Sequence, residues 1–336
     1  ARRLMRMLPN SHWIADALAK RPEAVAWLDD DAELAPRDLG RLGRELRALI
    51  ERHEDAEDAA ARVRAVRTRE LTRCAMSDLL AGIDPRGHAI ADAADTALLG
   101  ALEIAEREEA ARWGSPRARV AFIAMGRYGG RECSYASDAD VIAVHEAVGD
   151  ATPADAAASA TAIVNRVKKL LGSATSQLGL AVDLGLRPEG KNGPMSRTVE
   201  SHREYARRWG STWERQAAVR ARPIGDTPLA RRAGQLFEEI AYGDVSPADL
   251  RDIRLLKARM ENERLPRGIE PSRHVKLGPG GLTDVEWTIQ LIQMRHGRIT
   301  PSLRTPSTTG AIAAAAREGL VEPSDADTLL DAWDMA

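Results

Sequence analysis

Three aspartates have the residue type and the spacing to form one cluster of carboxylates. Asp138 and Asp140 are separated by a single residue, and Asp140 begins an apolar run that predicts a strand. Alternate residues of a strand face the same side, so we expect these two carboxylates to point in one direction. Like charges this close must be offset by protonation or by a cation, and oxygen ligands of this kind suit Mg²⁺.

The third aspartate, Asp183, lies between Val182 and Leu184 in another apolar run. We expect it to be buried at the centre of a strand, where an isolated charge would be costly. If that strand lies beside the strand of Asp140, the three carboxylates can hold two metal ions. One ion would lower the pKa of an attacking hydroxyl, and the other would stabilise a pyrophosphate leaving group.

Two glycines, Gly129 and Gly130, precede the paired aspartates and follow an expected strand. Glycine lets the backbone approach a ligand closely, and we expect the N–H groups here to be free to bind a triphosphate. A pair of glycines or a pair of aspartates is weak support on its own. Their order in the chain, together with the third aspartate, is a more specific pattern.

The elements that must position these residues predict an α+β fold with a small mixed sheet. Apolar runs bounded by turn residues predict strands over residues 120–125, 139–145 and 180–186. Apolar residues at helical spacing predict the helices, and Ser11 is the expected cap of the first one. The expected helices cover residues 11–19, 39–72, 96–113, 153–178, 201–222, 247–263, 283–296, 307–318 and 324–335.

We divide the chain into a helical leader (1–116), a catalytic core (117–226) and a second helical domain (227–336). The chain starts abruptly at Ala1 and stops inside an expected helix at Ala336, so we expect a fragment of a longer protein. Four tryptophans on expected helical stripes are predicted to be core, namely Trp209, Trp213, Trp287 and Trp333. In the second domain, helix capping explains Asp284 and Glu286, whereas Lys276 has either a structural role or a contact with nucleotide.

Composition excludes several classes of protein. The formal net charge of -2 argues against a general nucleic-acid binder, which would be clearly basic. Two cysteines, Cys74 and Cys133, imply no disulfide framework, so we expect a reducing cytoplasm. No apolar stretch approaches the roughly 20 residues that cross a bilayer. The seven histidines lack metal-ligand spacing, which argues against zinc.

The order of glycines and aspartates resembles the polymerase-β-like nucleotidyltransferase superfamily. A narrower resemblance, to the bacterial glutamine synthetase adenylyltransferase family, is carried by motifs that occur in the same order and span much of the chain. These motifs are GRYGGRE (126–132), YASDAD (135–140), VDLGLRPEG (182–190), TWERQAAVRAR (212–222) and KLGPGGLTDVE (276–286). One departure is Gly185, which stands where an arginine is common in the family, so a phosphate contact from that position is in doubt.

The resemblance implies transfer of AMP from ATP to a tyrosine of glutamine synthetase, with Mg²⁺ or Mn²⁺ required. Asp138 and Asp140 would bind both metal ions, and Asp183 would bind the ion that activates the tyrosine and accept its proton. Gly129, Gly130 and Ser137 would hold the triphosphate. Arg187 and Lys191 could neutralise phosphate charge, but a structural or solvated role is an equally good interpretation for each.

The resembled family is bifunctional, with two similar halves. The segments at 212–222 and 281–286 resemble the C-terminal half, which adds AMP. The alternative is the half that removes AMP by phosphorolysis to give ADP. An ATP-sensing module without turnover and an RNA-directed nucleotidyltransferase are two further hypotheses for the same residues. The resemblance also implies a small nitrogen-signalling regulatory protein as a partner of the full-length enzyme, and neither nucleic acid nor a membrane.

Overall fold

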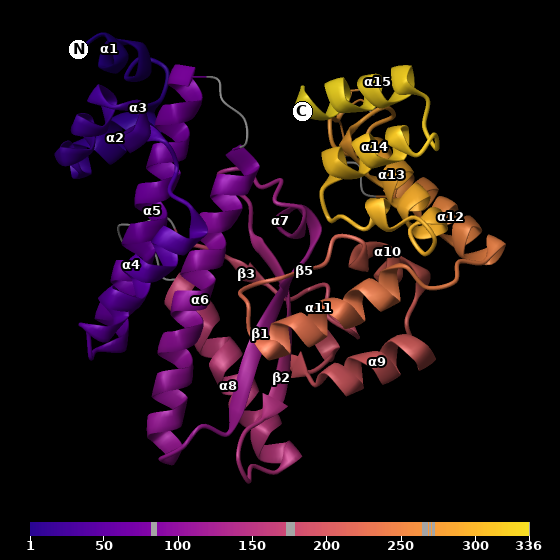
Figure 1. Ribbon diagram of the computed structural model, residues 1–336, viewed down its shortest axis with the longest axis horizontal. Helices are drawn as coiled ribbons and strands as arrows, with labels where there is room; N and C mark the ends of the chain where they lie inside the picture. The colour runs from indigo at the N-terminus through magenta and orange to yellow at the C-terminus, as the bar shows by residue number, and fades with distance from the viewer. Residues whose placement is uncertain (82–85, 173–178, 264–267, 269, 271–272, 336) are drawn as a thin grey trace.

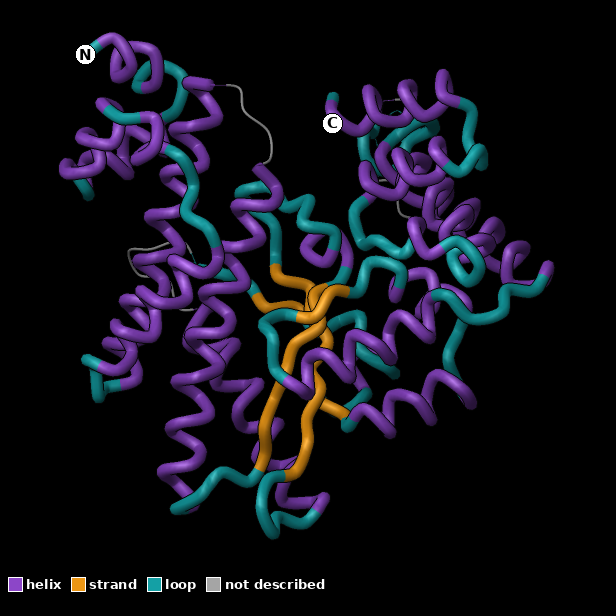
Figure 2. The backbone as a smooth tube through the Cα atoms, in the orientation of Figure 1, coloured by secondary structure: helices purple, strands orange, loops and turns teal. Residues whose placement is uncertain are grey.

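The structure is a computed structural model that describes residues 1–81, 86–172, 179–263, 268, 270 and 273–335. Its centre is a five-stranded mixed sheet, as Figure 2 shows. The strands are β1 (Ala118–Ala124), β2 (Ala139–Ala147), β3 (Val182–Asp183), β4 (Ser196–Arg197) and β5 (Arg222–Pro223). Helices surround this sheet, so the predicted α+β fold with a small mixed sheet is confirmed.

The sheet has the order β3-β2-β1-β5, and β4 also pairs with β2. β1 is antiparallel to β2 and β5, whereas β3 and β4 are parallel to β2. Successive residues of β1 belong to different apolar cores: Phe122 faces one and Ile123 the other. Both faces of the long hairpin are therefore covered, which explains why its strands read as continuous apolar runs.

One face of the sheet packs on α4 (Leu39–Glu51), α5 (Ala56–Ala81), α6 (Arg86–Trp113) and α8 (Pro153–Gly172). The other face packs on α9 (Val199–Arg208), α10 (Thr212–Ala218) and α11 (Pro228–Ala241) (Figure 1). Thus the longest helices, although they precede the sheet in the chain, share its main core.

The two ends of the chain form smaller helical groups, each with its own apolar cluster. The first group contains α1 (Arg2–Met7), α2 (His12–Lys20), η1 (Pro22–Asp29) and α3 (Asp31–Leu34), and it packs against one end of α5. Ser11 accepts a hydrogen bond from Ile14 N at 3.2 Å, which confirms the predicted cap. The last group contains α12 (Pro247–Glu263), α13 (Leu282–His296), η4 (Pro301–Leu303), α14 (Thr308–Arg317) and α15 (Pro323–Asp334).

Several predicted boundaries are wrong. The helix predicted over 39–72 is interrupted between α4 and α5, and the one predicted over 96–113 already begins at Arg86. The helix predicted over 201–222 is two helices, because Ser211 and Glu214 form a capping box that starts α10. The end of the helix predicted over 153–178 falls on residues 173–178, outside the described residues.

In the described part of the chain, no helix has the length and apolarity that spanning a membrane requires.

Candidate functional site

The predicted meeting of two aspartate strands is confirmed by the register of β2 and β3. Asp140 pairs with Asp183, and Ala139 pairs with Val182. Ala139 and Val182 both enter the main core, so Asp140 and Asp183 leave the sheet on the opposite side. Asp138 lies one residue before β2 and two before Asp140. The three carboxylates therefore lie on one side of the sheet at one end of β2.

Electrostatics confirm that these carboxylates influence one another. Burial, followed by the charges of Asp183 and Asp138, raises the pKa of Asp140 to about 6. The positive charge of Lys276 acts on the pKa of the same carboxyl in the opposite direction. Asp140 is nevertheless ionised at neutral pH, which keeps the carboxylate available as a ligand or a proton acceptor.

Asp183 is exposed, so the prediction of a buried aspartate at the centre of a strand is wrong. Its strand is only two residues long and lies at the edge of the sheet, although Val182 and Leu184 are buried. The N–H of Gly185 donates to Asp183 Oδ1 at 2.6 Å. This hydrogen bond orients the carboxylate toward solvent beside Asp140.

The carboxylates fit a divalent cation in chemical type. Three carboxylates offer the oxygen ligands that Mg²⁺ and Mn²⁺ bind. Within the described ranges, no three His, Cys, Asp or Glu side chains lie close enough together to enclose a metal ion in this conformation. The backbone register places Asp140 beside Asp183, so the two carboxylates belong to neighbouring strands.

The glycine-rich turn differs from its predicted form. Gly129 N donates to Met125 O at 2.7 Å and Gly130 N to Gly126 O at 3.2 Å, within the short helix α7 (Gly126–Gly129). The expectation that these N–H groups are free is therefore wrong. Both glycines instead make room for Arg220, because a Cβ on Gly129 would overlap the Arg220 carbonyl oxygen.

Gly126 is the residue of this turn that lies nearest the carboxylates. Its φ is +55°, and a Cβ there would lie 2.9 Å from Asp140 Oδ2. A side chain at this position would be both strained and in the way of the carboxylate. The sequence places Gly126 in the glycine-rich segment, but only the fold shows its contact with Asp140.

Ser137 shapes the turn that precedes Asp138. Its Oγ accepts a hydrogen bond from Ser134 N at 2.8 Å and lies 3.1 Å from Ser134 Oγ. Cys133, at the start of this turn, is buried, and burial raises the pKa of its thiol to about 12. The thiol therefore stays protonated at neutral pH, as expected for a residue that is not a nucleophile.

Arg187 organises the loop after β3. Its guanidinium donates to the carbonyl oxygens of Leu184, Lys191 and Gly193 at 2.9, 3.1 and 3.2 Å. These contacts favour the structural interpretation of Arg187. Lys191 lies on η2 (Gly190–Asn192) in the same loop, with its side chain exposed.

A buried ionic network that the sequence prediction missed joins the turn to the last helical group. Arg220, with 4% of its side chain exposed, pairs with Glu132 at 2.5 Å and donates to Gly126 O at 3.1 Å. Glu132 also accepts a hydrogen bond from Thr308 N, the first residue of α14, at 2.5 Å. Glu286 of α13 lies 3.8 Å from Arg220.

A second ion pair holds the turn against α6. Arg222 donates to both oxygens of Asp95, at 2.7 and 3.0 Å, and Tyr128 OH donates to the same carboxylate at 2.6 Å. The tyrosine is fully buried and Asp95 is 1% exposed. The turn that carries Gly126 is therefore fixed from two sides.

The second glycine-rich segment contributes a cation and the start of α13. Asp284 lies in the first turn of α13, as predicted for complementarity to the helix dipole, and accepts a hydrogen bond from Gly280 N at 2.6 Å. The N-cap itself is Gly281, without a side-chain cap, so the predicted capping role is wrong. Lys276 is exposed, and its charge acts on Asp140 and on Glu286. The choice between the two roles open to Lys276 stays a prediction.

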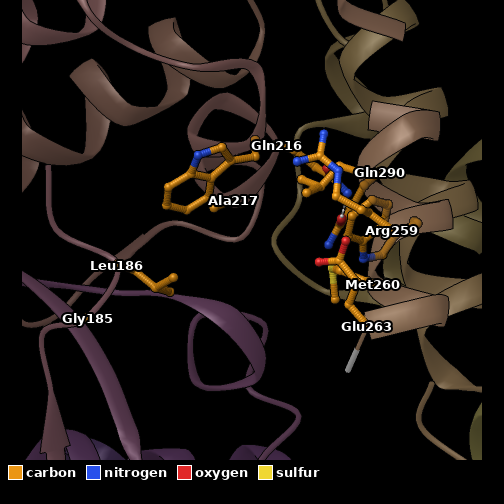
Figure 3. A pocket seen from close by; sticks show the side chains of 11 residues that line it. Gly185, Leu186, Gln216, Ala217, Arg259, Met260, Glu263 and Gln290 are labelled. Atoms are coloured by element: carbon orange, nitrogen blue, oxygen red, sulfur yellow. Dashed lines mark hydrogen bonds between the residues drawn. The ribbon is translucent and has the colours of Figure 1, made fainter. Parts of the chain in front are cut away.

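A cavity of about 590 Å³ lies between the loop that follows β3 and the last helical group, and Gly185, two residues after Asp183, is part of its lining. Figure 3 shows Leu186 on one side of it and Arg259, Met260 and Glu263 on the other. Trp213 lines this cavity and is 40% exposed, and Trp209 is 74% exposed. The prediction that these two tryptophans are core is therefore wrong, whereas Trp333 is buried as predicted.

Two family models match separate parts of the chain. Residues 1–236 match the family model described as glutamate-ammonia ligase adenylyltransferase. Residues 254–336 match the model described as GlnD PII-uridylyltransferase. The first match covers more than half of the chain.

Three relatives share the name bifunctional glutamine synthetase adenylyltransferase/adenylyl-removing enzyme. The protein of Leifsonia xyli is 44% identical over 99% of this chain and 33% of its own length. The protein of Streptomyces coelicolor is 41% identical over 100% of this chain and 35% of its own length. The protein of Cutibacterium acnes is 40% identical over 99% of this chain and 33% of its own length.

The chain thus spans about a third of the length of the curated relatives it matches. The resemblance stated from the five motifs is confirmed, although the choice between the two halves stays a prediction. The chain belongs to the glutamate-ammonia ligase adenylyltransferase family.

Proposed function

We propose that the chain transfers AMP from ATP to a tyrosine of glutamine synthetase and releases pyrophosphate. The observation that carries the proposal is the parallel register that pairs Asp140 with Asp183, with Asp138 two residues before Asp140. The family match and the names of the relatives supply the reaction class and the acceptor. The division into residues 1–116, 117–226 and 227–336 remains part of the same proposal.

Each residue has a task in this reaction. Asp138, Asp140 and Asp183 would hold Mg²⁺ or Mn²⁺, which supplies charge neutralisation at the transferred phosphate and favours ionisation of the acceptor hydroxyl. A tyrosine hydroxyl has an ordinary pKa of about 10, so it needs a proton acceptor at neutral pH. Asp183 is exposed at the end of its strand and is suited to receive that proton.

The triphosphate would lie over the turn of Gly126. Gly126 lies against Asp140 in this turn, and Ser137 lies in the next turn. The space beside Gly129 and Gly130 is taken by Arg220, so their part in holding the triphosphate would require a change in the turn. Lys276, whose charge acts on Asp140, would balance phosphate charge. Lys191 remains a candidate for the same task, whereas the hydrogen bonds of Arg187 tie it to its own loop.

The removal of AMP from glutamine synthetase by phosphorolysis is the second candidate. The names of the relatives include an adenylyl-removing activity, and the chain covers only about a third of each relative. The match of residues 254–336 to a PII-uridylyltransferase model also leads us to propose that a small nitrogen-signalling protein regulates the full-length enzyme.

Isotope transfer distinguishes the two candidates. Incubation of the protein with unmodified glutamine synthetase, Mg²⁺ and ATP labelled at the α-phosphate is expected to give labelled tyrosine and one pyrophosphate per AMP transferred. Chelation with EDTA is expected to stop the reaction, and Asp183→Asn is expected to be inactive in the presence of metal.

The opposite direction is measured with adenylylated glutamine synthetase and inorganic phosphate. Release of ADP in this reaction, without transfer from ATP, would assign the chain to AMP removal instead. Absence of activity in both directions, from a folded protein with metal present, would contradict the proposed function.

A further inference from the structure

The 590 Å³ cavity is lined on one side by the loop that follows β3. Gly185, whose N–H donates to Asp183, lines the cavity, and so does Leu186. Asp183 is therefore separated by only two positions in the chain from a residue that lines the cavity. This places the cavity next to the group expected to receive a proton from the acceptor.

The cavity is separate from the turn expected to hold the triphosphate. Among the described residues, none of the glycine-rich turn at 126–130 lines it. The turn follows β1, whereas Asp183 is on β3, at the far side of β2 in the sheet order. The carboxylates thus lie between two regions, one for the nucleotide phosphates and one on the side of Asp183.

The lining of the cavity suits an aromatic side chain with a polar edge. Two indoles, Trp213 and Trp287, and the apolar side chain of Met260 form part of its wall. Aromatic rings pack well on indoles, because an offset or edge-to-face contact adds to apolar burial. Gln216 Nε2 donates to Gln290 Oε1 at 2.8 Å, so this buried amide pair still offers one carbonyl and one NH₂ group.

We propose that this cavity binds the tyrosine-bearing segment of the acceptor protein and directs its hydroxyl toward Asp183. The inference rests on the proposed function and extends it by assigning the acceptor subsite. The tyrosine oxygen forms a bond to the α-phosphorus as the bond from that phosphorus to the β-bridging oxygen breaks. Pyrophosphate leaves with that oxygen, and the hydroxyl proton passes to the Asp183 carboxylate.

Replacement of Trp213 by alanine tests this assignment. We expect the KM for glutamine synthetase to rise about tenfold or more, since hot-spot aromatics dominate recognition, while the KM for ATP changes less than about twofold. Trp213→Phe, which keeps an aromatic wall, is expected to recover most of the affinity for glutamine synthetase. Trp209→Ala is the matched control, because Trp209 is 74% exposed and does not line the cavity.

A second measurement does not depend on kinetics. A photoreactive benzoylphenylalanine in place of Met260 is expected to cross-link to glutamine synthetase, and to do so with or without ATP. Two results would show that the cavity is a nucleobase pocket and would overturn the assignment. One is no cross-link from position 260 to glutamine synthetase, together with labelling of the cavity residues by a photoreactive ATP analogue. The other is a rise in the KM for ATP, but not for glutamine synthetase, in Trp213→Ala.

Two other results would also count against it. An equal effect of Trp209→Ala would show that the loss is not specific to the cavity. AMP transfer by the unaltered protein is measured before any variant is made. If the unaltered protein does not transfer AMP, this result contradicts the proposed function, and the assignment of the acceptor subsite falls with it. Transfer by the unaltered protein with no change in Trp213→Ala contradicts the acceptor subsite alone.

Discussion

Asp140→Asn is expected to lower the rate of AMP transfer about a thousandfold or more, because removing one preorganised group at a developing charge has effects of this size. Asp140 is the central carboxylate: it pairs with Asp183 in the sheet and interacts with Asp138. Asparagine keeps its shape but removes the charge. The rate is measured with labelled ATP and glutamine synthetase at saturating metal.

The same variant is expected to be more stable than the natural protein when metal is chelated at pH 8. Burial and the neighbouring carboxylates raise the pKa of Asp140 to about 6 in the folded state. The folded state therefore holds this proton more tightly than the unfolded state. That contribution to stability is present below about pH 4 and is lost as the pH rises through about 6.

At pH 8 the ionised carboxylate destabilises the fold, and asparagine removes this effect. Allowing for the partial exposure of Asp140, we expect a gain of about 1–2 kcal/mol in the free energy of unfolding, measured by urea in EDTA. The gain should shrink toward pH 4. A fully active Asp140→Asn, or one that is inactive because it is unfolded, would contradict this account of the residue.

Arg220→Ala is expected to destabilise the protein by about 3–5 kcal/mol, the usual cost of breaking a buried ion pair by removing one partner. The change leaves the Glu132 carboxylate without its cation, and Glu286 loses a charge 3.8 Å away. It also removes the donor to Gly126 O, so activity is expected to fall together with stability.

Two controls accompany this variant. Arg220→Lys keeps the charge but loses the planar fork, so an intermediate effect is expected in urea denaturation. Arg231→Ala removes an exposed arginine that pairs with Asp226 and is expected to change stability by less than about 1 kcal/mol. An Arg220→Ala variant as stable as Arg231→Ala would show that the network does not fix the turn.

The strand pair and its aspartates could be predicted because their signals are local. The alternation at Asp138 and Asp140 and the apolar runs around Asp140 and Asp183 are short patterns that sheet pairing preserves. The exposure of Asp183 could not be predicted in the same way. It depends on β3 being a two-residue edge strand, and strand neighbours are a property of the whole fold.

The role of the glycines could not be read from the sequence either. A Gly-Gly pair near acidic residues suggests a phosphate cradle, but here both N–H groups donate within α7. The missing Cβ atoms make room for Arg220, which is about 90 residues further along the chain. A contact between residues so far apart in the chain leaves no periodic pattern in the sequence. Composition and spacing therefore do not distinguish Arg220 from the many arginines that are exposed to solvent.

The exposure of Trp209 and Trp213 could not be predicted from the sequence either, because it depends on where one helix ends. Trp209 and Trp213 have helical spacing, which predicts an apolar stripe facing a core. In the structure α9 ends at Arg208, just before Trp209, and Ser211 caps a new helix, α10, which carries Trp213. Trp213 then faces the cavity, and Trp209 faces solvent.

The most direct test is a crystal structure of the protein with Mn²⁺ and an ATP analogue that cannot be cleaved between its α- and β-phosphates. We expect anomalous density for Mn²⁺ in contact with the carboxylates of Asp138, Asp140 and Asp183, with the triphosphate on the side of Gly126. Manganese bound only to phosphate oxygens, or at a place remote from Asp183, would contradict the claim that these three carboxylates form one metal centre.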